Sequence, residues 1–150
     1  MSRAEQFELL PDEVAQRWRK FGRSERIFYT QLLGIEVEEV RVDYCRMRLP
    51  FRPELQQPAG LVHGGALASL LDAVVVPAIG AVYEADVRFA TVDMHVQFMS
   101  AVRDHDVVGE GWVTRRGRTT AFCEAEAVDA VTGATVARSM LTYNIANPAG

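Results

Sequence analysis

The stretch from Gln57 to Asp72 reads QPAGLVHGGALASLLD and decides the fold. It begins as a polar loop, closes on Gly64-Gly65, and continues as an Ala, Leu and Val run that extends to Tyr83. Because that run is apolar on every side rather than along one stripe, it predicts a helix buried in a core. Asp72 is its one carboxylate, and a lone buried carboxylate is costly unless it is paired or used.

The helix is expected to begin at Gly64-Gly65, where backbone N–H groups lack partners inside the helix and the helix dipole is positive. A ligand oxygen can approach the main chain closely at such a position. Asp72 follows Gly64 at a separation of about 12 Å along a helix axis, which is too far for both to contact one carbonyl group. We therefore expect Gly64 of one chain to act with Asp72 of another chain, in an active site shared across a dimer.

The chain resembles hotdog-fold acyl-CoA thioesterases of the phenylacetic-acid-degradation type, with 4-hydroxybenzoyl-CoA thioesterases as close relatives. The resemblance rests on Gln57, His63-Gly64-Gly65, Asp72 and Thr91-Val92-Asp93-Met94, and it covers residues 33–144. It implies hydrolysis of an acyl-CoA to a free acid and CoA. It also implies a homodimer that pairs further into a tetramer, and no cofactor, since CoA is part of the substrate.

The resemblance also assigns roles to single residues. Gly64 matches the backbone N–H that polarises the thioester carbonyl, and Asp72 matches the nucleophile or general base on the central helix. Gln57 matches an Asn or Gln beside that carbonyl, and Thr91 matches a Ser or Thr that holds the attacking water. His63 is either a base or, as we favour, a neutral imidazole that hydrogen-bonds the backbone and orients Gly64.

Positive charge gathers around the two turns that flank one predicted strand, at Arg103, Arg115, Arg116 and Arg118. Such a group suits the anionic phosphates of CoA, although ordinary arginines on a solvated turn explain it equally well. We expect the substrate-binding residues to be Arg115, Arg116 and Arg118 of this group, together with Gly65 and Thr119.

The bulk composition excludes several classes of protein. A chain of 150 residues that is 49% apolar and 24% charged is typical of one soluble domain. The net charge of −4 argues against general nucleic-acid binding. The start lacks an apolar export segment and the run from Leu70 to Ile79 is too short to span a bilayer, so we expect a cytoplasmic protein with no membrane partner. Neither the histidines nor Cys45 and Cys123 have metal-ligand spacing, so we expect reduced core cysteines and no metal.

Residues 1–33 are expected to form a short helical arm on a domain that spans residues 34–150. The arm should contain helices over 11–21 and 24–33, the second capped by Ser24. The domain should be α+β, with five antiparallel strands wrapped around the long helix, which the resemblance makes a hotdog fold. The expected strands cover 35–49, 89–99, 106–115, 119–129 and 135–145.

Alternation along two of these strands makes finer predictions. In the strand over 35–49 the phase slips at Glu38-Glu39, which predicts a bulge. In the strand over 89–99, Thr91 alternates in phase with Asp93, which places the Thr91 hydroxyl on the polar face of the sheet.

Three other functions remain compatible with the sequence. A non-catalytic acyl-CoA sensor would use the same pocket, although the presence of Asp72 argues against it. A hotdog hydratase or dehydratase would need a His-Phe-Pro type motif that the chain lacks. A structural dimer without a ligand is the third.

Overall fold

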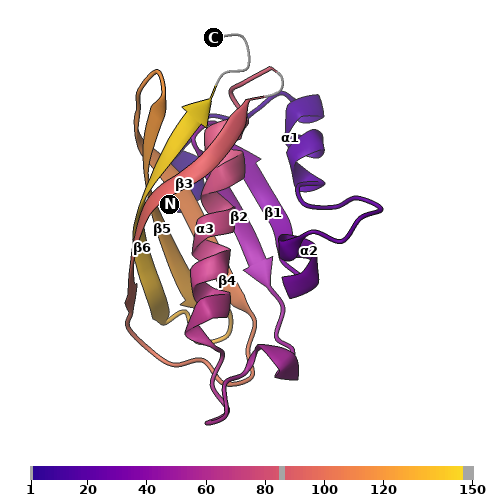
Figure 1. The fold of residues 1–150 in the computed structure, drawn as a ribbon, viewed down its shortest axis with the longest axis vertical. Coiled ribbons are helices and arrows are strands. Elements are labelled where there is room, and N and C mark those ends of the chain that lie inside the picture. The colour runs from indigo at the N-terminus through magenta and orange to yellow at the C-terminus, as the bar shows by residue number, and fades with distance from the viewer. Residues whose placement is uncertain (1, 85–86, 147–150) are drawn as a thin grey trace.

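The computed structural model describes residues 2–84 and 87–146, which form one antiparallel sheet with a long helix packed across it (Figure 1). The sheet has six strands in the order β1-β2-β4-β5-β6-β3. The strands are β1 Glu36–Arg41, β2 Tyr44–Leu49, β3 Arg88–Phe98, β4 Val107–Arg116, β5 Thr120–Asp129 and β6 Thr135–Ala146. Two short 3-10 turns, η1 Arg3–Gln6 and η2 Pro53–Leu55, lie outside the sheet. This is the predicted α+β architecture, with one strand more than predicted.

The long helix, α3 (Gly64–Gly80), begins at the predicted glycine pair and lies close against the sheet. Two glycines of β4 allow this approach. A Cβ atom at Gly109 would lie 2.9 Å from Cγ of Leu70, and one at Gly111 would lie 2.7 Å from Cγ1 of Val74. The contact buries the apolar face of α3 and fixes which residues of the helix point away from the sheet.

One stripe of α3 remains partly exposed. It consists of Ala68, Ser69, Asp72 and Val76, which recur at a spacing of three or four residues and therefore share one face of the helix. The sequence predicted a helix buried on every side. In the single chain this stripe, which includes Asp72, is the part that the sheet does not cover.

The prediction of one strand over 35–49 is wrong, because a turn at Val42-Asp43 divides it into β1 and β2. Asp43 has φ 59°, a left-handed conformation that Asp adopts more readily than most residues. Since the turn contains neither Gly nor Pro, nothing in the sequence marks a break. The bulge predicted at Glu38-Glu39 is confirmed by a register shift between β1 and β2.

The N-terminal arm contains two helices that pack beside β1 and α3 (Figure 1). The helix predicted over 11–21 is α1 (Asp12–Arg19). The helix predicted over 24–33 is only α2 (Tyr29–Leu33). It starts late because the Ser24 hydroxyl donates to a backbone carbonyl two residues later, at 2.6 Å, and does not cap a helix.

Among residues 2–84 and 87–146, no helix combines the length and apolarity needed to cross a membrane. The same residues contain no group of three or more His, Cys, Asp or Glu side chains that could hold a metal ion. Cys45 and Cys123 are free thiols buried in the core, as predicted, and burial raises the pKa of Cys123 to about 12.

Candidate functional site

The start of α3 is organised by His63. This residue is the N-cap of the helix, and its Nδ1 accepts a hydrogen bond from the Gly65 N–H at 2.8 Å. An accepting Nδ1 carries no proton, so the ring is a hydrogen-bond acceptor for the backbone, as we favoured from the sequence. Within the described residues the Gly64 N–H has no acceptor. The cap thus leaves one backbone donor free at the positive end of α3.

A cavity of about 390 Å³ lies beside this donor, lined by both Gln57 and Gly64. The Gln57 amide oxygen accepts from the Ala59 N–H at 2.5 Å, so its NH₂ group is the end that can donate. The Phe98 ring covers Gly64 so closely that a Cβ there would lie 3.2 Å from the ring. We call Gln57, His63, Gly64 and Gly65 the helix-start half-site.

Asp72 is held by two hydroxyl groups. Its Oδ1 accepts from Thr91 at 2.9 Å and from Tyr143 at 2.5 Å, and the Tyr143 hydroxyl also lies 2.8 Å from the Asp72 carbonyl oxygen. Burial and the neighbouring Asp72 raise the pKa of Tyr143, so this hydroxyl stays protonated and donates. In the described part of the chain, Oδ2 of Asp72 has no hydrogen bond. We call Asp72, Thr91 and Tyr143 the carboxylate half-site.

Thr91 reaches Asp72 because of a bulge in β3. Thr91 pairs with Tyr143 and Asp93 with Thr142, so Val92 is an extra residue on the β3 side. The bulge turns Thr91 toward α3. The prediction that Thr91 shares the polar face with Asp93 is therefore wrong, since unbroken alternation was assumed through Val92.

Sequence reasoning missed Tyr143 altogether. It lies on β6, more than seventy residues after Asp72, and is only 2% exposed. A buried Tyr normally finds a partner for its hydroxyl, but the sequence does not say which partner.

The two half-sites do not meet within one chain. Gly64 and Asp72 are separated by about 12 Å along α3, as expected. On β3, Thr91 contacts Asp72 whereas Phe98 lies over Gly64. The edge strand therefore has one half-site near each of its ends.

The predicted arginine group is divided by the fold. Arg116 donates to Asp43 at 2.5 Å, to the Ile79 carbonyl at 3.0 Å and to the Tyr83 hydroxyl at 3.1 Å, which ties it to the end of α3. Arg115, near the end of β4, and Arg118, on the turn between β4 and β5, are exposed.

Arg103 lies before β4 and the other three arginines lie at its far end, so the four flank this strand as the sequence indicated, and their role toward CoA stays a prediction. The backbone carbonyl of Thr119 accepts from the Ile145 N–H at 2.8 Å, next to the exposed turn.

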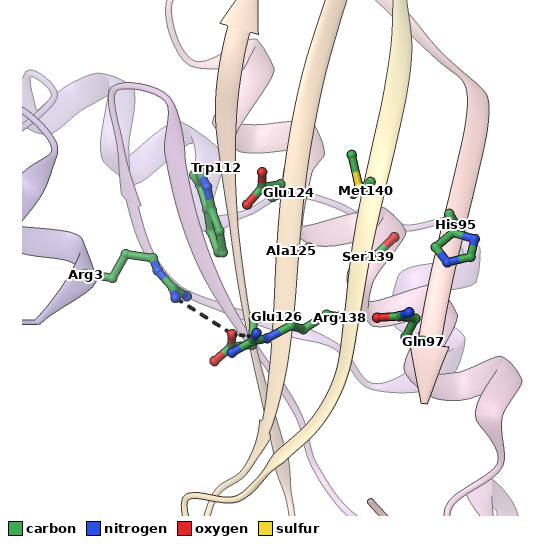
Figure 2. A pocket seen from close by; sticks show the side chains of 10 residues that line it. All are labelled: Arg3, His95, Gln97, Trp112, Glu124, Ala125, Glu126, Arg138, Ser139 and Met140. Atoms are coloured by element: carbon green, nitrogen blue, oxygen red, sulfur yellow. Dashed lines mark hydrogen bonds and ion pairs between the residues drawn. The ribbon is translucent and has the colours of Figure 1, made fainter. Parts of the chain in front are cut away.

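Another cavity, of about 510 Å³, lies on the sheet face away from α3 and contains none of the predicted site residues (Figure 2). Arg3, Glu126 and Arg138 line it, and Glu126 lies 3.8 Å from Arg3 and 2.8 Å from Arg138. The cavity is thus bordered by ion pairs, whereas both half-sites lie on the α3 side.

The family model of the thioesterase superfamily matches residues 59–136, more than half of the chain, including the start of α3, Asp72 and Thr91. The chain belongs to the thioesterase superfamily. We accordingly assign it as a thioester hydrolase, and both the resemblance seen in the sequence and the hotdog fold are confirmed.

Human acyl-coenzyme A thioesterase 13 is 28% identical over 104 residues, which are 69% of this chain and 72% of that protein. A conserved protein from Pseudomonas aeruginosa superposes with TM-score 0.76 at 26% identity, covering 85% of this chain and 98% of that one. The E. coli PaaI protein from the phenylacetic acid degradation operon shares the fold with TM-score 0.72 at 17% identity, covering 79% and 83% of the two chains.

Proposed function

We propose that the protein hydrolyses an acyl-CoA thioester to a free acid and CoA, in sites that each use two copies of the chain. The observation that carries the proposal is the position of the half-sites on one exposed edge strand. Phe98 and Val92 of β3 are 55% and 66% exposed. An exposed edge strand presents unpaired backbone N–H and C=O groups that can pair with a strand of another chain.

The geometry of β3 supports pairing with a second copy of itself. Because Val92 is an extra residue at the bulge, the midpoint of a pairing that sets Thr91 opposite Phe98 falls at His95. Two β3 strands paired antiparallel about that midpoint would set Thr91 of one chain opposite Phe98 of the other. Asp72 of the partner subunit would then approach the Gly64 donor. The same face carries the partly exposed stripe of α3.

The chemistry follows from the free groups of each half-site. The Gly64 N–H and the Gln57 NH₂ donate to the thioester oxygen and stabilise the negative charge that develops on it. The partner subunit's Asp72 presents Oδ2, while Oδ1 is held by hydroxyl groups. Oδ2 either attacks the carbonyl carbon or takes a proton from a water that attacks it. Collapse of the tetrahedral intermediate breaks the C–S bond, and CoA leaves as the thiolate and is protonated. Attack by water releases the acid directly, whereas attack by Oδ2 leaves an acyl–Asp72 anhydride that a water molecule then hydrolyses.

Two-fold symmetry also gives the exposed arginines a role. It would place the partner's β4–β5 turn, residues 117–119, and the adjoining end of β4 at the end of the dimer at which Gly64 lies. Arg115 and Arg118 are then available to the phosphates of CoA, whereas Arg116 maintains the end of α3. We further propose that dimers pair into a tetramer and that the enzyme works in the cytoplasm.

Mixed dimers test the proposal. Gly64→Pro removes the N–H without breaking α3, because proline is well tolerated at the first position of a helix. The extended conformation of His63, φ −63° and ψ 134°, is one that a residue before proline adopts. Asp72→Asn removes the carboxylate. A mixed dimer of the two variants has one site with both groups intact.

After subunit exchange, an equal mixture should regain roughly a quarter of wild-type CoA release, since half the dimers are mixed and each has one working site. Size-exclusion chromatography and mass spectrometry should verify the mixed dimers. Mixed dimers that stay as inactive as either variant alone would contradict a shared site. Acyl-CoA binding without thiol release by the wild type would instead favour the sensor.

A further inference from the structure

A second cavity on the α3 side lies at the C-terminal end of the helix, away from Gly64. Its volume is about 400 Å³. It is lined by Arg17, Trp18, Gly80, Tyr83, Glu84, Val87 and Phe89, of which three are aromatic and two are charged. None of these residues takes part in the chemistry proposed above.

Trp18 comes from α1 in the N-terminal arm, and glycine at position 80 makes room for it. A Cβ atom at Gly80 would collide with the indole ring. The rings of Tyr83 and Phe89, with centroids 6.0 Å apart, form the adjoining wall. The arm therefore closes one end of a cavity whose other walls come from Gly80 of α3, Phe89 of β3 and three residues between these elements, Tyr83, Glu84 and Val87.

Both α3 and β3 lead from Asp72 to this cavity. Asp72, Val76 and Gly80 recur at a spacing of four residues and lie along one side of α3. Phe89 precedes Thr91 by two residues on β3 and so projects from the same face of the sheet. The path from Asp72 to Gly80 is about 12 Å long. Val76, midway along it, is only partly buried.

In the proposed dimer this cavity adjoins the reacting carbonyl. The β3 pairing would set Phe89 opposite Ser100 of the other chain, and Ser100 lines the cavity at Gly64. An acyl group whose carbonyl is bound at Gly64 would thus extend along the partner's helix toward Trp18 of the partner subunit.

We propose that Trp18 forms the end wall of the acyl pocket and limits the length of the acyl group that the enzyme accepts. This inference rests on the proposed acyl-CoA hydrolysis. A path of about 12 Å that ends at aromatic rings suits an apolar acyl group of medium length, aliphatic or ending in an aromatic ring. Trp18 is then a specificity-determining residue, contributed by the arm.

The test is a series of straight-chain acyl-CoAs of increasing length, with kcat/KM measured by free-thiol release. Trp18→Leu and Trp18→Ala should move the optimum to longer chains and raise kcat/KM for the longest about tenfold or more. Short acyl groups do not reach Trp18 and should react as with the wild type. Trp112→Leu is the matched control, because Trp112 lines the cavity on the other face of the sheet (Figure 2).

A second measurement uses the fluorescence of Trp18. The chain has two tryptophans, so Trp18 is the only one left in Trp112→Phe. A non-hydrolysable thioether analogue of a long acyl-CoA should change its emission, and a short analogue should not. If the Trp18 variants do not fold, this fluorescence change tests by itself whether a long acyl group reaches Trp18.

Two results would overturn the inference. One is a wild-type length profile in folded Trp18 variants, and the other is Trp18 emission that a bound long analogue leaves unchanged. Either result leaves the proposed hydrolysis intact as long as Asp72→Asn is inactive. An active Asp72→Asn enzyme would instead remove the proposed mechanism itself.

Discussion

The helix-start half-site comes from one continuous segment, residues 57–65, whereas the carboxylate half-site joins three elements far apart in the sequence. The first depends on the main chain, with a backbone donor left free by the His63 cap. The second depends on side chains of α3, β3 and β6 that meet only in the folded chain. A site built from local backbone can be recognised in a sequence, but one built from distant side chains can be recognised only in part.

The largest expected effect belongs to the carboxylate half-site. Asp72→Asn keeps the size of the side chain and removes the group that attacks or takes a proton. We expect kcat to fall by about 10²- to 10⁴-fold, with the dimer intact. Free-thiol release and sedimentation measure the two properties. Near-normal turnover would remove Asp72 from the mechanism and leave the helix-start half-site without a counterpart.

The next effect tests the backbone donor alone. Gly64→Pro and Gly64→Ala both add atoms beneath the Phe98 ring, where a Cβ would lie 3.2 Å away, but only proline lacks the N–H. We expect kcat to fall about 10²- to 10³-fold for Gly64→Pro, and far less for Gly64→Ala.

The comparison of these two variants tests the hydrogen bond, because both place a Cβ beneath the Phe98 ring and only proline removes the donor. Equal losses in both would mean that crowding against Phe98, rather than the missing donor, explains the effect. Circular dichroism should show that both variants retain α3.

The helix-start half-site could be predicted from the sequence, because its residues lie in one continuous segment. A glycine pair opening an apolar helix predicts exposed backbone donors, and the helix rise alone showed that Gly64 and Asp72 are too far apart for one carbonyl group. His63 next to that pair predicted a contact with the backbone, which the structure contains. Each step used spacing along one segment, so no tertiary contact had to be known.

The remaining contacts could not be predicted in the same way. The bulge at Val92 leaves no mark in the alternation, because Val92 is as apolar as a core position although it is 66% exposed. Nor does the turn at Val42-Asp43 carry a glycine. Tyr143 meets Asp72 only because β6 lies beside β3 in the sheet. Such pairings depend on strand order, which local patterns do not determine.

Tyr143→Phe tests the hydroxyl groups of the carboxylate half-site, and its expected effect is smaller. The change keeps the ring and removes the hydroxyl, so Asp72 retains Thr91 as its one side-chain donor. We expect kcat to fall roughly tenfold, the value of one hydrogen bond to a charged group. Thr91→Val should act in the same direction. If neither variant changes kcat, these hydroxyl groups fix the fold around Asp72 without orienting it for reaction.

The smallest effect lies outside both half-sites, at His105 and Asp129. The Nδ1 atom of His105 lies 2.9 Å from Oδ2 of Asp129, and this hydrogen bond raises the pKa of His105. Burial opposes ionisation of Asp129, but the N–H groups of Thr132 and Val131 and the His105 ring lower its pKa to about 2.

The sign of each shift sets a window of pH for stability. A raised histidine pKa stabilises the folded chain below about pH 6.5, and this contribution disappears as the pH rises through the folded-state value. The lowered pKa of Asp129 contributes above about pH 4, and that contribution disappears as the pH falls toward 2. The free energy of unfolding of the wild type, measured with urea, should therefore fall slightly from pH 6 to pH 9. In His105→Gln it should depend less on pH over this range.

The same variant separates stability from chemistry. Because His105 joins the β3–β4 loop to the end of β5 and contacts neither half-site, His105→Gln should leave the pH dependence of kcat unchanged. A change in the pH dependence of kcat would mean that the reaction responds to a group remote from Gly64 and Asp72. The division of the active site into two half-sites would then be incomplete.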